Sequence, residues 1–175
     1  MKSVLIFTIA LLITISSFAQ EKLTTKSGVL KFEASTENFE PVAAINKTAS
    51  AILKSDGSIA VLGLIKGFQF KKKLMQEHFN QPKFMDSEKF PKAKFSGKLV
   101  DYKGEAGEYK VVGKLTIHGE TKEITSLATI KNVDDVIYLN TKFTVDVADY
   151  GIEIKSKLAK KIAEKVNIEV SLELK

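Results

Sequence analysis

The chain contains no cysteine, no tryptophan and no arginine among its 175 residues. Without cysteine it has neither a disulfide framework nor a thiol nucleophile, and zinc sites built from cysteine are excluded. All 27 basic residues are therefore lysine, interleaved with 21 acidic residues for a net charge of +6. Nucleic-acid recognition favours the planar guanidinium fork of arginine. The composition therefore argues against nucleic-acid binding, and its excess of lysine is compatible with transient contact with an anionic membrane surface.

Histidine is scarce as well, with only His78 and His118. The two are isolated from each other and from any HxH or HExxH spacing, so no metal site is predicted. The sequence also has no GxSxG nucleophile elbow. Its carboxylates are not spaced as a buried acid–base pair. We therefore predict no catalytic residue, no metal ligand and no cofactor; His118 is expected to be a hydrogen-bonding turn residue.

Residues 1–19 have the layout of a secretory signal peptide. One lysine precedes an apolar stretch, 4–15, interrupted only by threonine, and Ser17 and Ala19 are the small residues before a cleavage site at Gln20. The alternative is a membrane anchor, but the apolar stretch is shorter than the roughly 20 residues that a spanning helix needs. We expect a periplasmic or secreted protein of one domain, residues 20–175. The sequence does not fix its oligomeric state and is compatible with a dimer.

Alternation of apolar and polar residues dominates the remainder of the chain. The last segment, 166–174, places five apolar residues on one face and four polar residues on the other. A strand is also expected at 29–34, and three hairpins at 48–54 with 58–65, 94–102 with 109–118, and 121–133 with 136–147. Such a series favours an all-β fold, either a sandwich or, preferably, an antiparallel barrel of about eight strands, which leaves no edge exposed. A barrel of this size is either filled by side chains or open for one small ligand.

Two segments have helical rather than alternating spacing. Residues 72–81 place Leu74, Met75, His78 and Phe79 on one stripe before Pro82, and residues 157–165 form a second amphipathic segment. Two short helices on a barrel either cover its mouth or plug its interior, and the sequence leaves both readings open.

Phenylalanine is concentrated in one irregular stretch. Six of the eleven phenylalanines fall between residues 68 and 95, in part within a loop bounded by Pro82 and Pro91. Core packing explains some of these rings, but strand alternation does not require aromatic side chains in such a loop. Apolar side chains near a barrel mouth are a natural lining for an apolar ligand.

Three motifs in this chain resemble a known family. The octapeptide Leu115–Lys122 (LTIHGETK) is similar to the LTIHGxTK signature of YceI-like proteins, and Phe84–Pro91 followed by Phe95 is similar to their DxxK-aromatic-P stretch. His78-Phe79 and Asp149–Ile152 match further elements in the same order. The resemblance implies an exported, lipocalin-like barrel that binds a polyisoprenoid or related lipid without catalysis.

The chain departs from that family at two positions that often carry arginine, one before the histidine and one before the late aspartate. Val147 occupies the second of them. If those arginines hold a headgroup in the relatives, this chain must hold it differently or bind another amphiphile.

We therefore predict a barrel that sequesters or carries one long-chain amphiphilic lipid. Its headgroup is expected to meet His78 or, as an alternative, a lysine such as Lys89. Two other hypotheses stay open: a ligand-free barrel acting as an interaction or stress-response module, and an enzyme acting on lipid precursors. The predicted ligand-contacting residues are Phe68, Phe70, Leu74, Met75, His78, Phe79, Phe84, Met85, Phe90 and Phe95.

Overall fold

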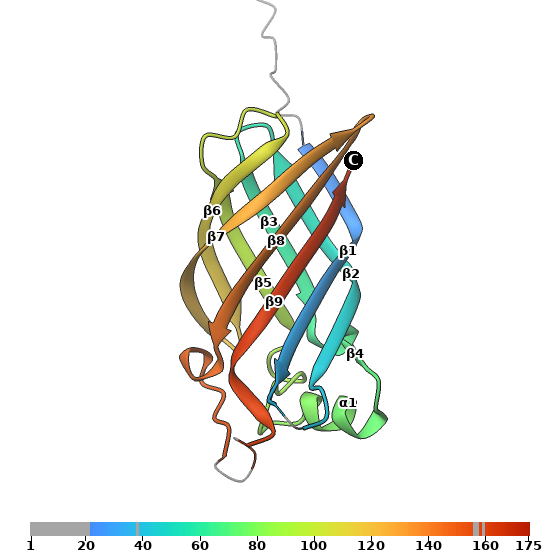
Figure 1. The fold of residues 1–175 in the computed structure, drawn as a ribbon, viewed down its shortest axis with the longest axis vertical. Coiled ribbons are helices and arrows are strands. Elements are labelled where there is room, and N and C mark those ends of the chain that lie inside the picture. The colour runs from blue at the N-terminus through green and yellow to red at the C-terminus, as the bar shows by residue number, and fades with distance from the viewer. Residues whose placement is uncertain (1–21, 38, 156–157, 159) are drawn as a thin grey trace, which may run out of the picture.

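Antiparallel strands close into a barrel in the computed structural model, which describes residues 22–37, 39–155, 158 and 160–175 (Figure 1). The strands are β1 (Lys22–Ser35), β2 (Ala43–Lys54), β3 (Ser58–Leu64), β4 (Gln69–Phe70), β5 (Lys92–Leu99), β6 (Gly107–Ile117), β7 (Glu120–Val133), β8 (Val136–Asp146) and β9 (Ile162–Leu174). The helices are α1 (Lys73–Asn80) and two 3-10 turns, η1 (Ile65–Gly67) and η2 (Val147–Tyr150).

The order of the strands explains the closure. Neighbours run β1-β9-β8-β7-β6-β5-β3-β2, and β1 also pairs with β2, so the eight long strands leave no free edge among themselves. The two-residue β4 pairs only with the start of β2. The predicted barrel of about eight antiparallel strands is confirmed, and the sandwich alternative is wrong.

The three predicted hairpins are present as β2–β3, β5–β6 and β7–β8. A fourth, β6–β7, turns at His118 and Gly119, whose φ angles are 52° and 85°. Two successive positive φ values are typical of a type I′ turn, whose twist matches that of the flanking strands. His118 therefore occupies a backbone conformation that few residues other than glycine adopt easily.

The predicted helix at 72–81 is confirmed as α1, whereas the helix predicted at 157–165 is wrong in its second half. Residues 162–165 belong to β9, where Ile162 pairs with Ser35 and Lys165 pairs with Asp146. Pairing with two neighbouring strands there overrides the local helical spacing. Residues 157 and 159, like the predicted signal peptide 1–19, lie outside the described residues.

The two ends of the barrel differ. We define the closed end as the one with the β2–β3, β5–β6 and β7–β8 turns. The open end is the one with α1, η2 and the β1–β2 connection (Figure 1). A packed core fills the closed end, with fully buried side chains from six strands: Leu53, Ile59, Leu99, Ala128, Ile130, Leu139 and Leu174. Towards the open end a second cluster combines buried side chains, such as Tyr150 and Val145, with many that are only partly buried.

Among the described residues, no helix is long and apolar enough to cross a bilayer.

Candidate functional site

A cavity of about 620 Å³ occupies the barrel interior between the packed core and the open end. Its floor is the top of that core, because Ile59, Val111 and Leu139 belong both to the core and to the cavity lining. At its other end the lining includes Phe39 and Leu74, which are 43% and 61% exposed. The cavity therefore reaches the surface at the open end.

The wall of the cavity consists of the inward side chains of the strands. Those that face it are mostly aliphatic or aromatic, among them Val61, Phe95, Ile124, Phe143, Ile168 and Val170. Ser126 and Thr141 add two hydroxyls, and they bond to each other at 3.0 Å, while Thr141 Oγ1 lies 2.8 Å from the backbone oxygen of Leu127. The wall thus offers a bound molecule an almost wholly apolar surface, with its hydroxyls already paired.

Four phenylalanine rings anchor α1 at the mouth. The Phe79 ring stacks on Phe32 at a centroid distance of 5.4 Å, and lies 6.0 Å from Phe68 and 5.0 Å from Phe70. These rings come from β1, η1's C-cap, β4 and α1, so one cluster holds the helix against two parts of the sheet. We call Phe32, Phe68, Phe70 and Phe79 the aromatic cluster. Since all four rings line the cavity, α1 borders the mouth and does not plug the interior.

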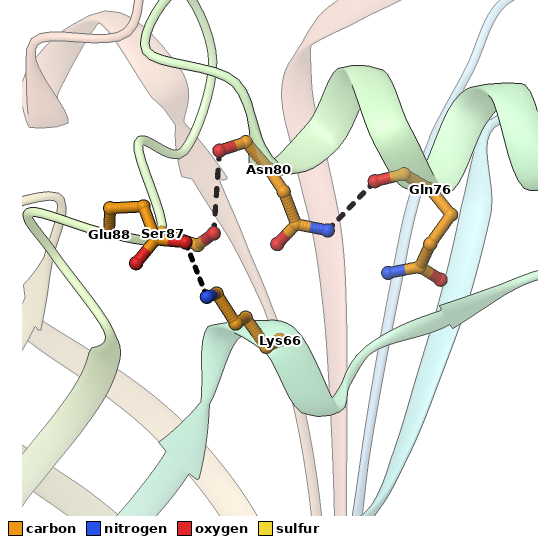
Figure 2. Close-up of polar contacts among 5 residues, drawn as sticks. All are labelled: Lys66, Gln76, Asn80, Ser87 and Glu88. Carbon is orange, nitrogen blue, oxygen red and sulfur yellow. Dashed lines mark hydrogen bonds and ion pairs between the residues drawn. The ribbon is translucent and has the colours of Figure 1, made fainter.

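The segment after α1 is held by polar contacts (Figure 2). Ser87 is buried, and both its backbone N–H and its hydroxyl donate to the backbone oxygen of Asn80, at 3.2 and 3.4 Å. The Asn80 side chain donates to the backbone oxygen of Gln76 at 2.8 Å. An ion pair of 2.5 Å joins Glu88 to Lys66 on η1. These contacts fold residues 81–91 back onto the mouth, so that Phe84 and Met85 join the cavity lining.

The structure brings nine of the ten predicted site residues to the cavity: Phe68, Phe70, Leu74, Met75, His78, Phe79, Phe84, Met85 and Phe95. Phe90 is not among the lining residues. Its ring packs on the imidazole of His118 at a centroid distance of 4.4 Å and covers Gly119. The loop turns Phe90 towards the β6–β7 turn because its backbone N–H donates to the Asp86 oxygen at 2.8 Å. Placement at the cavity does not test ligand contact, which stays a prediction.

The charged side chains at the mouth differ in part from those expected. His78 is exposed and borders the cavity, whereas Lys89 does not, since its ammonium lies over the neighbouring Phe90 ring at 5.1 Å. Lys83 and Lys161 border the mouth instead. Sequence reasoning missed both, because no local pattern distinguishes a lysine at a mouth from any other exposed lysine.

His118 has the predicted structural role. Its Nδ1 lies 3.1 Å from the backbone oxygen of Tyr150, which can only accept, so Nδ1 carries the proton. Its Nε2 is buried and has no hydrogen-bond partner among the described residues. The imidazole therefore links the β6–β7 turn to η2 and does not face the cavity.

The position of the second missing arginine is apolar. Val147, in η2, lines the cavity beside Tyr150. Burial, and secondarily the charge of Asp149, raises the pKa of the Tyr150 phenol. This part of the wall offers no cation to a bound headgroup.

The described part of the chain holds no group of three or more His, Asp or Glu side chains arranged to bind a metal ion. On the outer surface of the barrel, a hydrogen bond with Lys142 lowers the pKa of the Glu169 carboxyl.

Comparison with known proteins identifies related folds. The structure resembles that of BcnA from Burkholderia cenocepacia, with a TM-score of 0.72 and 18% identity over 84% of this chain and 96% of that one. A polyisoprenoid binding domain from Saccharophagus degradans, implicated in plant cell wall breakdown, superposes with a TM-score of 0.74 and 14% identity over 89% and 98%. The YCEI protein of Campylobacter jejuni gives 0.65 and 20% over 79% and 86%.

No curated protein is significantly similar to this chain in sequence. Residues 13–174, however, match the sequence profile of the YceI-like domain. That match spans nearly the whole chain and includes every strand from β1 to β9, so the protein belongs to the YceI-like family.

Proposed function

We propose that this protein binds one long-chain amphiphilic lipid, a polyisoprenoid or a similar molecule, inside the barrel and so sequesters or carries it. The observation that carries the proposal is the apolar cavity of about 620 Å³ that opens at one end. Ligand pockets in proteins are typically about 300–1,000 Å³ and mostly apolar. The description of the Saccharophagus relative as a polyisoprenoid binding domain supports the class of ligand.

Hydrophobic transfer supplies the affinity in this proposal. Burying an apolar chain contributes about 0.8 kcal/mol per methylene, or nearly four-fold in Kd. The lipid tail needs no polar group to pair with the wall, because the hydroxyls of Ser126 and Thr141 already bond to each other. Affinity should therefore rise with chain length until the tail reaches the floor formed by Ile59, Val111 and Leu139.

The headgroup is proposed to stay at the open end. The packed core blocks the other end, and the charged or titratable residues that border the cavity include His78, Lys83, Lys161 and Glu40. If arginines hold the headgroup in relatives, these lysines would supply the cations in this protein. A carboxylate or phosphate headgroup fits these side chains best.

The two other hypotheses receive less support. A ligand-free module would need a filled barrel, whereas this one encloses a large cavity. An enzyme would need reactive groups in that cavity, and its described lining consists largely of hydrocarbon side chains. We also propose export to the periplasm or outside the cell, and only the signal-peptide layout of residues 1–19 supports it.

Native mass spectrometry of the purified protein, with isoprenoid or fatty-acyl probes, tests the proposal. We expect one bound lipid per chain, and a Kd that falls about four-fold for each added methylene in a homologous series. Ile124→Trp places a large ring in the lumen and should abolish uptake, since Ile124 lines the cavity.

Thr125→Trp is the matched control, because Thr125 lies on the same strand but is exposed on the outer face. It should bind lipid like the parent protein. A homogeneous apo mass, together with no uptake of any probe by the parent protein, would refute lipid binding.

A further inference from the structure

Charge is distributed unevenly between the two ends of the barrel. The three turns of the closed end carry five acidic residues, Asp56, Asp101, Glu105, Asp134 and Asp135, but one lysine, Lys103. The stretch from η1 to the start of α1 at the open end carries four lysines and no acidic residue: Lys66, Lys71, Lys72 and Lys73. The closed-end turns are therefore acidic, whereas the open end carries this lysine-rich stretch, with acidic residues such as Glu37, Glu77 and Asp149 outside it.

Two further lysines lie beside aromatic rings of the mouth. Lys83 Nζ is 5.6 Å from the centre of the Phe84 ring, and Lys161 Nζ is 6.0 Å from that of Phe39. Phe39 is 43% exposed. Leu74, on α1 directly after the lysine stretch, is 61% exposed. Exposed apolar side chains and lysines thus lie close together at the opening, a combination typical of surfaces that bind at a membrane interface.

Ion pairs neutralise acidic residues at the open end. Glu40 pairs with Lys72 at 2.6 Å, and Glu88 pairs with Lys66 at 2.5 Å. Lys71, Lys83 and Lys161 have no carboxylate partner among the described residues. These three ammonium groups are therefore available to an external anion.

The three segments that form the rim are tied to one another. Besides the Glu40–Lys72 pair, the hydroxyl of Thr36 donates to the backbone oxygen of Lys160 at 2.7 Å. The β1–β2 connection is thereby joined to α1 on one side and to the segment before β9 on the other. The rim is a connected surface, so its lysines and apolar side chains can meet a flat partner together.

We infer that the open end docks on an anionic phospholipid bilayer, with Phe39 and Leu74 at the interface and the lysines against the headgroups. Each lysine near an anionic surface contributes about five-fold in binding. The closed end also exposes two apolar residues, Val100 and Val133. Asp101 and Asp134 follow them directly, and the anionic headgroups would repel these carboxylates. Docking would bring the cavity mouth to the membrane, where a lipid could enter or leave. This use of docking rests on the proposed function, whereas docking itself does not require a ligand.

Co-sedimentation of the ligand-free protein with vesicles tests this inference. We expect binding to vesicles of 30% phosphatidylglycerol in phosphatidylcholine, weakened by salt, and little binding to phosphatidylcholine alone. The double variant Lys71→Glu with Lys73→Glu, two lysines that do not line the cavity, should bind at least ten-fold more weakly. Leu74→Ser should also weaken binding, whereas Val133→Ser at the closed end should not.

The matched control is Lys54→Glu with Lys103→Glu, which changes the net charge equally but at the closed end. It should retain binding within about two-fold. Equal loss in both double variants would overturn an oriented docking face, and no binding of the parent protein to phosphatidylglycerol vesicles would overturn docking altogether. Uptake of a lipid probe from solution separates this result from the proposed function, because it should be unchanged in both double variants and in Val133→Ser, whose residues do not line the cavity.

Discussion

Gly97 and Gly113 lie directly opposite each other on the inner wall of the barrel, and the tip of the Phe95 ring rests over both. A Cβ atom on either glycine would lie 2.6 Å from Phe95 Cζ. It would also approach the other glycine's Cα to 2.8 Å or less. Since neither position has a side chain, the Phe95 ring can lie against the sheet. This glycine pair therefore keeps the lumen open where the ring would otherwise cross it.

Gly113→Ala should displace the Phe95 ring into the cavity. We expect a loss of stability of about 1–3 kcal/mol from overpacking. The Kd for a long acyl probe should rise about four-fold for each methylene that no longer fits. Probe displacement and thermal unfolding measure the two effects.

A suitable control is Gly104→Ala at the closed end, where a Cβ meets no atom within 4 Å but φ is 86°. It should lower stability through backbone strain and leave probe affinity unchanged. The pair Gly113→Ala with Phe95→Leu should recover affinity. Unchanged affinity of Gly113→Ala would show that Phe95 does not limit the lumen.

Phe79→Ala should release α1 from the mouth. The substitution removes three ring contacts, each contributing about 0.5–1.5 kcal/mol. Amides of α1 should then exchange with solvent faster, while those of β7 and β8 stay protected, and lipid probes should exchange faster. Leu74→Ala, an exposed position on the same helix, should leave the exchange of α1 unchanged. A uniform loss of protection across the barrel would contradict a local role for Phe79.

Alternation predicted the inward face of the barrel but not which inward residues border empty space. In β9, alternate residues from Val166 to Leu174 face inward. Leu174 lies in the packed core alone, whereas the four before it line the cavity: Val166, Ile168, Val170 and Leu172. Period two assigns a side chain to a face. How deeply it is covered depends on side chains from distant strands, which no local pattern contains.

The same limit explains why the predicted site residues omit Phe32 and include Phe90. Phe32 lines the cavity, and its place in the aromatic cluster depends on α1 and β4, more than 35 residues away in the sequence. Phe90 belongs to the predicted loop, but one backbone hydrogen bond to Asp86 turns it to His118. Loop direction follows from such single contacts.

His118→Ala should lower stability without changing ligand affinity. It removes the bond to the Tyr150 oxygen and the contact with Phe90, and it leaves alanine at a φ of 52°. The lost hydrogen bond and the lost ring contact together cost about 1–3 kcal/mol. His118→Asn should lose less, because asparagine adopts this conformation more readily. Reduced probe affinity at unchanged stability would instead indicate that His118 contacts the ligand.

Tyr150 and Tyr102 should make the fold sensitive to alkali. Burial raises the pKa of both phenols above the usual value of 10.0, with smaller contributions from Asp149 and Tyr109 respectively. Well below pH 10 the two phenols are protonated in both the folded and the unfolded protein, so they add no pH dependence to the free energy of unfolding. Above it the unfolded phenols ionise first, so the free energy of unfolding falls as the pH rises towards the folded pKa.

Urea denaturation between pH 8 and pH 11 measures this decline. Tyr150→Phe cannot ionise and should show a shallower decline than the parent protein, and Tyr138→Phe, a partly exposed position in β8, should not. Parallel curves for the parent protein and Tyr150→Phe would show that burial of this phenol does not affect alkaline stability.

Asn46→Ala should be strongly destabilising although it lies outside the cavity wall. The side chain is fully buried, and its Nδ2 donates to the Leu64 oxygen at 2.9 Å. Its Oδ1 accepts from both the N–H and the hydroxyl of Thr48, at 2.8 and 2.9 Å. Alanine leaves the Leu64 oxygen and the Thr48 N–H without these partners, at a cost of about 2–4 kcal/mol. Thr48→Val removes one hydroxyl bond and should cost about 1 kcal/mol.

The consequence should extend to the mouth, because Asn46 fixes the point where β3 turns into η1 and so the position of Phe68. Gly67 packs so closely on it that a Cβ there would lie 2.6 Å from Nδ2. We therefore expect Gly67→Ala and Asn46→Ala both to weaken probe binding, measured at a temperature where each variant is folded. Thr48→Val, which leaves the bond to Leu64 intact, should bind normally. Normal binding by all three variants would mean that the aromatic cluster is positioned by α1 alone.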